Sequence, residues 1–182
     1  NASVSVPGSK SQTNRALLIS ALADGITRLN NALFSDDSLY LVNALQKLGF
    51  SINLNPKTHQ MTIIGLGGKI PVRQASLFIG NAGTAARFLT AFLCLADNGS
   101  YRLDGIARMR ERPLEDLVIA LERFGAHITP TREDIESIYL PVKISASGLK
   151  GGQTSIAGNV SSQFLSALLM TAPYAQTPVE IE

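Results

Sequence analysis

The sequence predicts a mixed α+β fold that is built from repeated βαβαββ units around a pseudo-threefold axis. An internal repeat is the first reason, because Arg15, Arg87 and Gln163 occupy the same register at the start of three similar apolar helices. The second reason is that strand-like and helix-like patterns alternate around these helices. Such units imply right-handed crossovers with helices packed on mixed sheets. Three of them would bury the repeated helices centrally and gather the helix starts at one end.

The first unit is expected over about residues 12–70. Its first helix has apolar residues at helical spacing and stops at Gly25. Its second helix carries leucine or valine at every third position from Leu39 to Leu48 and ends at Gly49. In chain order, we predict a helix at 12–24, a strand at 27–31, a helix from Ser35 or Asp36, and a hairpin of strands at 51–54 and 61–64.

The second unit is expected over about residues 76–147, and it repeats the pattern of the first. Segments 42–49 and 118–125 correspond almost residue by residue, which supports an equivalent second helix. Pro113 would open that helix because proline is favoured in a first helical turn. The predicted elements are a helix at 84–96, a strand at 100–104, a helix from Pro113 to Gly125, and strands at 126–129 and 138–144.

The third unit, over about residues 153–182, is shorter than the other two. We predict a strand near residue 153, a helix from Ser161 and a strand at 179–182, with no second helix or final hairpin. Terminal repeats are often atypical, which is one explanation. We favour another, that the chain is a piece of a longer protein. In that case an apolar face of the third unit lacks its covering helix.

Composition narrows the class of protein. The chain has 182 residues, of which 45% are hydrophobic and 16% charged, as expected for a well-buried globular protein. Its net charge of +2 does not indicate a general polyanion binder, and its single cysteine excludes an internal disulfide framework. We expect no membrane partner because no apolar run reaches transmembrane length. We expect a cytoplasmic location because no signal peptide is recognisable.

The starts of the repeated helices have the residue types that bind anions. Ser, Thr, Asn and Gly at a helix start leave backbone N–H groups free at the positive end of the helix dipole. In the first start, Lys10 and Arg15 bracket a cluster of hydroxyl and amide side chains. In the second, Gly83 would let the backbone approach a ligand, Thr84 can cap, and Arg87 lies one turn into an apolar helix. Considered alone, the first start is explained about as well by an ordinary helix cap with a solvated lysine and arginine. The alternative for the second start is that Arg87 extends its charged group to solvent.

Two further segments become candidates for anion binding when they are considered together with these helix starts. Arg108, Arg110 and Arg112 alternate in what reads as an extended turn, which would place their charged groups on one side. We expect two of the three to be solvated, and the local sequence supports an anion-binding role for any one of them about as well as a solvated position. The segment at 160–163 would be a simple serine cap if it did not open the third repeated helix.

The other reactive residues have structural explanations. Cys94 lies inside an apolar helix and is expected to be a small core residue. His59 and His127 have no metal-ligand spacing around them, and Asp36 and Asp37 are typical charges at a helix start. The sequence contains no zinc motif and no dinucleotide fingerprint, so we expect neither a metal nor a cofactor.

Four segments, taken together and in this order, resemble the EPSP synthase family of enolpyruvyl transferases. They are Pro-Gly-Ser-Lys-Ser-Gln-Thr-Asn-Arg at 7–15, Gly-Asn-Ala-Gly-Thr-Ala-Ala-Arg at 80–87, Arg-Met-Arg-Glu-Arg-Pro at 108–113 and Val-Ser-Ser-Gln-Phe-Leu-Ser-Ala-Leu-Leu-Met at 160–170. The likeness spans essentially the whole chain. Phe88 departs from the pattern, because many members of the family have proline there.

The resemblance implies a reaction and a set of site residues. The enolpyruvyl group of phosphoenolpyruvate would pass to the 5-hydroxyl of shikimate-3-phosphate by addition–elimination, which releases phosphate and needs no metal or cofactor. Lys10 matches a catalytic lysine that contacts both substrates. The residues matched to shikimate-3-phosphate binding are Lys10, Ser11, Arg15, Ser161, Ser162 and Gln163, and those matched to phosphoenolpyruvate binding are Lys10, Asn81, Gly83, Thr84, Arg112 and Gln163.

The resemblance further implies the inside-out α/β fold of the enolpyruvyl transferases, with residues 1–182 as the N-terminal globule. Family members are about twice as long, and their acidic general acid/base residues and a second lysine lie in a C-terminal globule. That globule is therefore the expected partner, and we expect the chain alone to be inactive. The first strand, Ala2 to Val6 within residues 1–8, would cross to it.

Three other functions stay open. The enolpyruvyl transferase of cell-wall synthesis, which acts on UDP-N-acetylglucosamine, normally has Lys-Asn in place of Lys10-Ser11 and often a cysteine in the loop matching 105–112. RNA terminal phosphate cyclases use similar units, but near-neutral charge and scarce aromatic residues argue against nucleic-acid binding here. A stand-alone binding module, or one part of a split enzyme, would retain the anion sites without turnover.

Overall fold

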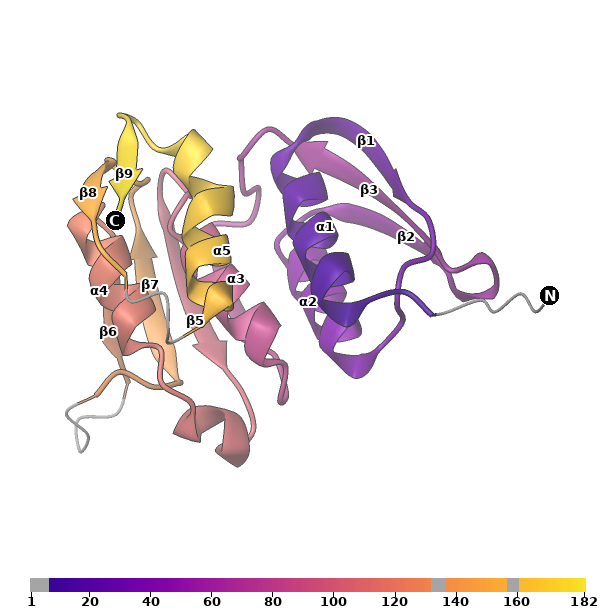
Figure 1. The fold of residues 1–182 in the computed structure, drawn as a ribbon, viewed down its shortest axis with the longest axis horizontal. Coiled ribbons are helices and arrows are strands. Elements are labelled where there is room, and N and C mark those ends of the chain that lie inside the picture. Colours follow the sequence, from indigo (N-terminus) through magenta and orange to yellow (C-terminus); the bar gives the residue numbers. More distant parts are fainter. Residues whose placement is uncertain (1–6, 132–136, 157–160) are drawn as a thin grey trace.

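The structure is a computed structural model that describes residues 7–131, 137–156 and 161–182. Helices lie between two outer sheets, one formed by strands within residues 24–66 and one by strands within residues 74–146 (Figure 1). The predicted first strand at Ala2 to Val6, and Val160 at the third helix start, lie outside the described residues.

The first unit forms an antiparallel sheet of order β1-β3-β2, which is covered by two helices. The hairpin of β2 and β3 and the second helix confirm the prediction, and Ser35 caps that helix through a reciprocal bond with Ser38. The elements are α1 (Lys10–Leu22), β1 (Asp24–Leu29), α2 (Asp36–Lys47), β2 (Ser51–Asn55), a 3₁₀ turn η1 (Pro56–Thr58) and β3 (Gln60–Leu66).

The predicted bounds of the first helix and strand were wrong by two or three residues. The helix α1 begins at Lys10 because the Ser9 hydroxyl accepts a hydrogen bond from the amide of Gln12. Gly25 does not end the helix. It lies inside β1 with φ +101°, paired with Gly65 of β3, so the chain is already extended there.

The second unit has the complete βαβαββ order and a sheet of order β4-β5-β7-β6, in which β4 and β5 are parallel. The elements are β4 (Gln74–Phe78), α3 (Gly83–Leu93), β5 (Gly99–Asp104), a 3₁₀ turn η2 (Ala107–Glu111), α4 (Glu115–Arg123), β6 (His127–Pro130) and β7 (Val142–Ala146).

Three predicted bounds in this unit were also wrong. The helix α3 ends at Leu93 rather than residue 96, because the chain turns from Cys94 onward. The carbonyl of Ile138 accepts a hydrogen bond from Leu114, which lies before α4. That bond takes Ile138 out of the sheet ladder, so β7 begins only at Val142, and α4 begins at Glu115 instead of Pro113.

The third unit contains two parallel strands joined through a helix. These strands pair in parallel on either side of a helix, as β4 and β5 do on either side of α3 in the second unit. The strand order β1-β3-β2 of the first unit likewise matches the order β5-β7-β6 of the second unit. These matches confirm the predicted fold class. The elements are β8 (Gly152–Thr154), α5 (Ser162–Thr171), a 3₁₀ turn η3 (Ala172–Tyr174) and β9 (Val179–Ile181).

Helix α3 is the centre of the core. It packs against α1, α2, α4 and α5, and every residue of it except Arg87 is buried. The prediction that all three repeated helices are buried centrally was wrong for α1 and α5, which leave Ile19 53% and Leu169 55% exposed. The reason is that α2 packs against α1 and α3, and α4 against α3 and α5, but the described residues supply no helix between α5 and α1.

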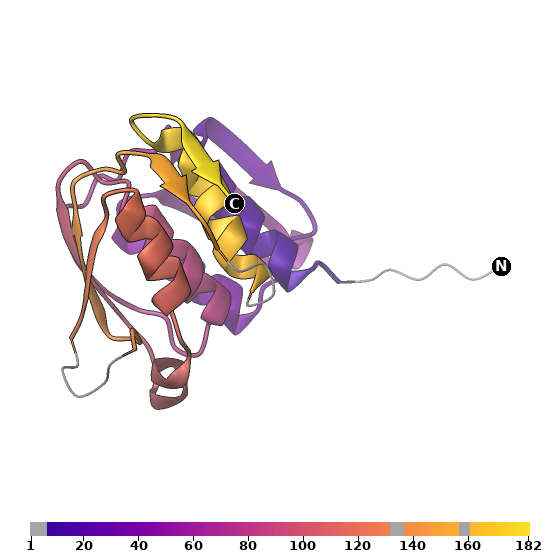
Figure 2. The ribbon, with the colours of Figure 1, turned by 60° about the vertical axis from the view of Figure 1, so that its left-hand side comes forward.

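The repeated helices run side by side and begin at the same end of the molecule (Figures 1 and 2). This arrangement brings segments together that lie about 70 residues apart in the sequence. None of the helices in the described part of the chain is long and apolar enough to cross a membrane.

Candidate functional site

The first group of site residues, which we name the Arg15 group, consists of Arg15, Ser11 and Ser166. One terminal nitrogen of Arg15 donates to the hydroxyl of Ser11 and, at 3.2 Å, to its carbonyl oxygen. The Nε and Nη2 atoms donate to the Ser166 hydroxyl at 3.2 and 2.8 Å. The guanidinium carbon also lies 5.5 Å from the ring centroid of Phe88. Arg15 therefore joins α1 to α5 and rests on α3.

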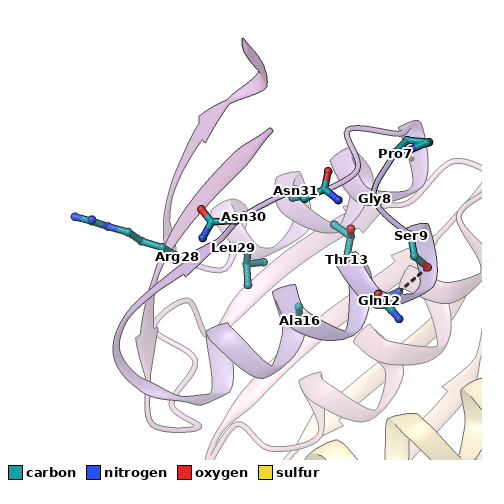
Figure 3. Close-up of a pocket in the computed structure, with 11 residues that line it drawn as sticks. Pro7, Gly8, Ser9, Gln12, Thr13, Ala16, Arg28, Leu29, Asn30 and Asn31 are labelled. Carbon is teal, nitrogen blue, oxygen red and sulfur yellow. Dashed lines mark hydrogen bonds between the residues drawn. The ribbon is translucent and has the colours of Figure 1, made fainter. Parts of the chain in front are cut away.

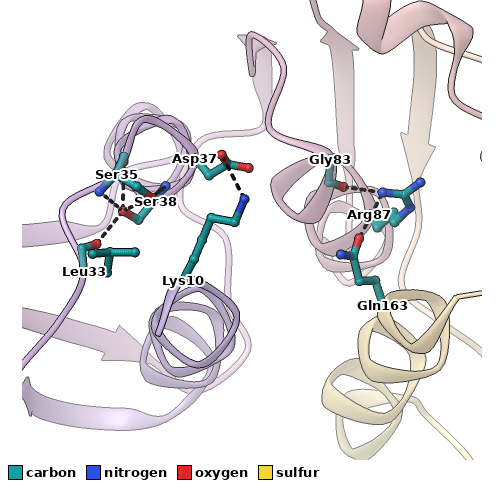
Figure 4. Close-up of polar contacts among 8 residues, drawn as sticks. All are labelled: Lys10, Leu33, Ser35, Asp37, Ser38, Gly83, Arg87 and Gln163. Atoms are coloured by element: carbon teal, nitrogen blue, oxygen red, sulfur yellow. Dashed lines mark hydrogen bonds and ion pairs between the residues drawn. The ribbon is translucent and has the colours of Figure 1, made fainter. Parts of the chain in front are cut away.

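The second group, the Gly83 group, consists of Gly83, Arg87, Arg112 and Gln163. Arg87 donates to the side-chain oxygen of Gln163 at 2.9 Å and to the carbonyl of Gly83 at 3.2 Å (Figure 4). A Cβ atom placed on Gly83 would lie 2.7 Å from Nη1 of Arg112 and 2.8 Å from Nη1 of Arg87. The two guanidinium groups therefore converge over one glycine at the start of α3.

The electrostatics of the Gly83 group favour an anion. Burial lowers the pKa of Arg87 from its ordinary value, and the neighbouring charge of Arg112 lowers this pKa further. Among the described residues, neither arginine has a carboxylate within ion-pair distance, and the Nε atom of Arg87 is buried without a partner. A phosphate or carboxylate bound here would relieve the repulsion between the charges of Arg87 and Arg112 and would accept hydrogen bonds from both guanidinium groups.

The start of α3 adds backbone donors to this group. The prediction that Thr84 caps the helix was wrong, because Ala82 occupies the N-cap position and no side chain caps it. Since no hydroxyl competes for the first backbone N–H groups, they stay available to a ligand at the positive end of the helix dipole. Thr84 itself is buried in the first turn.

The three arginines before α4 do not share one side, and that prediction was wrong. The segment is a 3₁₀ turn, η2, rather than extended chain, so successive side chains diverge. Arg110 binds Asp104 through two parallel hydrogen bonds of 2.9 Å, whereas Arg112 reaches Gly83 and Arg108 is exposed. Asp104 had no sequence signal beyond its place at the end of a strand.

Asp104 anchors this turn to the sheet. It is almost fully buried, and it also accepts hydrogen bonds from Arg102 at 2.9 Å and from the amide of Gly105 at 2.8 Å. Because it holds Arg110 near the end of η2, it restricts the position of Arg112, two residues later.

Lys10 lies apart from both groups, between α1 and α2. Its Nζ atom is 3.5 Å from Oδ2 of Asp37, in the first turn of α2 (Figure 4). Asp37 and Asn81 both line a cavity of about 290 Å³ beside the start of α3. Besides adding charge at the start of α2, as the sequence indicated, Asp37 therefore pairs with Lys10 and lines the cavity beside α3.

The third helix start contributes residues to both groups. Ser161 caps α5, with its hydroxyl accepting from the amide of Gln163 at 3.2 Å. The carbonyl of Ser162 accepts from the hydroxyl of Ser166, which in turn accepts from Arg15. Sequence reasoning missed Ser166, although it lies one turn after Ser162 and so occupies the same face of the helix.

Three larger cavities in the described part of the chain contain none of the predicted site residues, and two of them lie beside α1. One, of about 490 Å³, lies between the start of α1 and the end of β1, where Thr13, Asn30 and Asn31 line it and Arg28 points away (Figure 3). The other, of about 720 Å³, lies near the opposite ends of α1 and α3 and is lined by Lys69 and Arg73 among others. Across the described segments, no group of three His, Cys, Asp or Glu side chains could hold a metal ion.

Comparison with known proteins identifies the family. The family model of EPSP synthase (3-phosphoshikimate 1-carboxyvinyltransferase) matches residues 1–182. The chain belongs to the EPSP synthase family. It is 51% identical over 184 residues to the 3-phosphoshikimate 1-carboxyvinyltransferase of Trichormus variabilis and 52% identical to that of Nostoc sp. PCC 7120. Each alignment covers 100% of this chain and 42% of the relative, so the chain spans about two fifths of their length.

Solved structures agree with this membership. The EPSP synthase of Acinetobacter baumannii is similar with a TM-score of 0.84 and 31% identity, covering 94% of this chain and 38% of that one. The enolpyruvyl transferase NikO of Streptomyces tendae, at a TM-score of 0.59 and 13% identity, shares the fold. The resemblance to the EPSP synthase family that the four sequence segments indicated is thus confirmed.

The site residues expected from the family lie at one end of the three repeated helices. Ser11 and Arg15 belong to the Arg15 group, and Gly83, Arg112 and Gln163 to the Gly83 group. Lys10 and Asn81 lie beside them, on the side of α2. Arg87, which the sequence analysis named at the second helix start without assigning it a ligand, joins Gly83 to Gln163.

Proposed function

We propose that this chain forms the substrate-binding N-terminal part of an EPSP synthase. That enzyme transfers the enolpyruvyl group of phosphoenolpyruvate to the 5-hydroxyl of shikimate-3-phosphate and releases phosphate. One observation carries the proposal: the half-buried guanidinium groups of Arg87 and Arg112 converge over Gly83 without a carboxylate partner among the described residues, beside a third arginine, Arg15, that is held by neutral groups. Family membership adds independent support.

Two neighbouring cationic groups suit a reaction between two phosphorylated acids. The Gly83 group would hold phosphoenolpyruvate, with Asn81 and Thr84 at the helix start and the forks of Arg87 and Arg112 over its anionic groups. The Arg15 group would hold shikimate-3-phosphate, with Ser161 and Ser162 supplying hydroxyls from α5. Gln163 lies between the two groups and could touch both ligands.

The chain's contribution to catalysis would be to place the two ligands. Carbon–oxygen bond formation between the 5-hydroxyl and C2 of phosphoenolpyruvate requires that these atoms approach closely and in the correct orientation. Lys10 would be the catalytic residue of this half, with its ammonium group in contact with both ligands, and its ion pair with Asp37 would keep that group oriented. The proton transfers to and from C3 need acid/base groups, which we assign to a C-terminal globule.

We also propose the domain organisation that the family implies. Residues 1–182 would be the N-terminal globule, with units at about 12–70, 76–147 and 153–182, and residues 1–8 would cross to the C-terminal globule. The repeated strand pairings support the division into units, and the 42% coverage of the relatives supports the second globule. A cytoplasmic location stays a prediction of the sequence.

Titration calorimetry with shikimate-3-phosphate tests the proposal. Lys10→Ala and Arg15→Ala should each reduce the binding free energy by about 1.5–3 kcal/mol, the range for hydrogen bonds to charged groups. Arg28→Ala is the matched control, because Arg28 is an exposed arginine whose side chain points away from the helix starts (Figure 3). Its affinity should equal that of the unsubstituted chain.

Two results would contradict the proposal. One is unchanged affinity in both Lys10→Ala and Arg15→Ala while circular dichroism shows an intact fold. The other is binding of labelled RNA that weakens steeply with salt, since counterion release marks a nucleic-acid interface.

A further inference from the structure

Two arginines make cation–π contacts with phenylalanine rings, and the two contacts are related by the internal repeat. The guanidinium carbon of Arg15 lies 5.5 Å from the ring centroid of Phe88, and that of Arg87 lies 5.2 Å from the ring centroid of Phe164. Phe88 and Phe164 are equivalent in the repeat, because each directly follows the register position occupied by Arg87 or Gln163. Each arginine therefore stacks on the phenylalanine of the next repeated helix.

The Phe88 ring is a rigid support. The side chain is fully buried in α3, the helix that packs against four others, so it has little freedom to move. The long Arg15 side chain is the mobile partner, and its guanidinium is attracted to the negative face of the ring. The ring thus limits Arg15 in a direction that the hydrogen bonds to Ser11 and Ser166 do not control.

The chemistry of the partners matters as much as the geometry. Ser11, Ser166 and Phe88 are all uncharged, and no described carboxylate lies within ion-pair distance of Arg15. A carboxylate would hold the guanidinium equally well but would compete with an anionic ligand for it. Neutral hydroxyls and an aromatic ring hold the group while its charge stays available.

We propose that Phe88 is a positioning residue that holds the Arg15 guanidinium in the orientation in which it binds an anionic group of shikimate-3-phosphate. This inference rests on the proposed function of the Arg15 group. It also gives a physical meaning to the departure from the family pattern at Phe88, directly after the second segment, because proline at this position would offer Arg15 no aromatic face.

The variant Phe88→Leu removes the ring and keeps an apolar side chain of similar bulk. Phe92→Leu is the matched control: it lies one turn later in α3, is equally buried, and packs its ring against Phe50 at 5.7 Å between centroids. In calorimetry with the 182-residue chain, Phe88→Leu should weaken shikimate-3-phosphate binding about three- to tenfold, as loss of a cation–π contact predicts. Phe92→Leu should lower the melting temperature similarly and leave the affinity within about twofold.

A double-mutant cycle separates positioning from packing. Once Arg15→Ala has removed the guanidinium, adding Phe88→Leu should cost no further affinity, because the two changes act on one interaction. Equal losses of affinity in Phe88→Leu and Phe92→Leu would overturn the inference. So would a Phe88→Leu effect that persists in the Arg15→Ala background.

The test also distinguishes this inference from the proposed function beneath it. If the unsubstituted chain binds no shikimate-3-phosphate, the proposed function fails and the inference fails with it. If the chain binds but Phe88→Leu has no selective effect, the inference alone fails. If Phe88→Leu does not fold, Phe88→Met replaces it, because methionine is unbranched, apolar and lacks a ring face.

Discussion

Gly83 shows how one absent side chain shapes the candidate site. The space that a Cβ atom would fill is occupied by the terminal nitrogens of Arg87 and Arg112. Both contacts are made by the ends of flexible side chains and not by backbone, so the helix itself does not require glycine here. The missing side chain at Gly83 therefore allows two guanidinium groups to approach the helix start, which matters for ligand binding more than for folding.

We predict that Gly83→Ala weakens phosphoenolpyruvate binding by about 1–2 kcal/mol, as expected when charge-assisted hydrogen bonds are misaligned. The added methyl group must displace both guanidinium groups, since its distances to them would be 2.7 and 2.8 Å. Nuclear magnetic resonance titration with phosphoenolpyruvate measures the change. Affinity for shikimate-3-phosphate and the melting temperature are the internal controls, and a larger loss in either of these would refute the reasoning.

Cys94 illustrates a residue whose chemistry is suppressed by burial. Its thiol is fully buried and contacts the carbonyl of Thr90 at 3.1 Å, and burial raises its pKa to about 12. Because the thiolate is the reactive form, the folded chain should react very slowly with iodoacetamide at pH 8, and the urea-unfolded chain rapidly. Mass spectrometry of the alkylated product reports the difference. Rapid modification of the folded chain would be inconsistent with this burial.

The raised pKa of Cys94 also determines how this residue makes the stability of the fold depend on pH. The thiol has a higher pKa when folded than its ordinary 9.0, so the folded state binds the proton more tightly. Its contribution to stability is fully present below pH 9 and falls as the pH rises towards the folded value. Replacing it by alanine should therefore reduce the alkaline loss of stability.

Among the elements, the turn η2 depends on the sheet for its conformation. Asp104 at the end of β5 receives Arg110 from the turn and Arg102 from its own strand, each at 2.9 Å. Nearly half of each arginine side chain is exposed to solvent, whereas only 7% of the Asp104 side chain is. Loss of a contact would therefore leave the Asp104 carboxylate unsatisfied, while the arginines could bind water instead.

Asp104→Asn should lower the free energy of unfolding by about 1–2 kcal/mol, because the amide retains the size but not the charge of the acceptor. It should also weaken phosphoenolpyruvate binding, since η2 would hold Arg112 less firmly. Urea denaturation measures the first effect. Asp97→Asn is the control, because Asp97 is exposed and has no ion pair among the described residues, and an equal loss there would contradict the assignment.

Boundaries of elements were predictable where local chemistry decides them. Ser35 and the reciprocal bond with Ser38 start α2 where the sequence indicated. Gly25 was misread as a helix stop, because glycine permits both a helix end and a strand with positive φ, and the pairing with Gly65 decides between them. Ile138 likewise reads as strand until the distant amide of Leu114 binds its carbonyl.

At the scale of the whole molecule, the described residues supply cations and hydroxyls to the helix starts but few acids. Asp37 is the carboxylate closest to Lys10 in the described part of the chain, and it is already paired with it. A general acid or base must be within reach of the reacting atoms and be free to exchange a proton.

We therefore expect the 182-residue chain, supplied with both substrates, to release no phosphate above background. A colorimetric phosphate assay measures this, with the full-length Trichormus variabilis relative as the positive control. Release that increases in proportion to chain concentration and disappears in Lys10→Ala would show that the chain is competent alone and would overturn this expectation.

The repeat, the fold class, the family and the anion-binding residue types at the three helix starts could all be predicted from the sequence, because they depend on the spacing and composition of short segments. The side-chain pairings could not be predicted and are known from the folded arrangement: Arg110 with Asp104, Arg112 over Gly83, Arg87 with Gln163 and Arg15 on Phe88. The physical reason is that an arginine side chain reaches several neighbours, and which of them it meets depends on how helices from distant parts of the chain pack together.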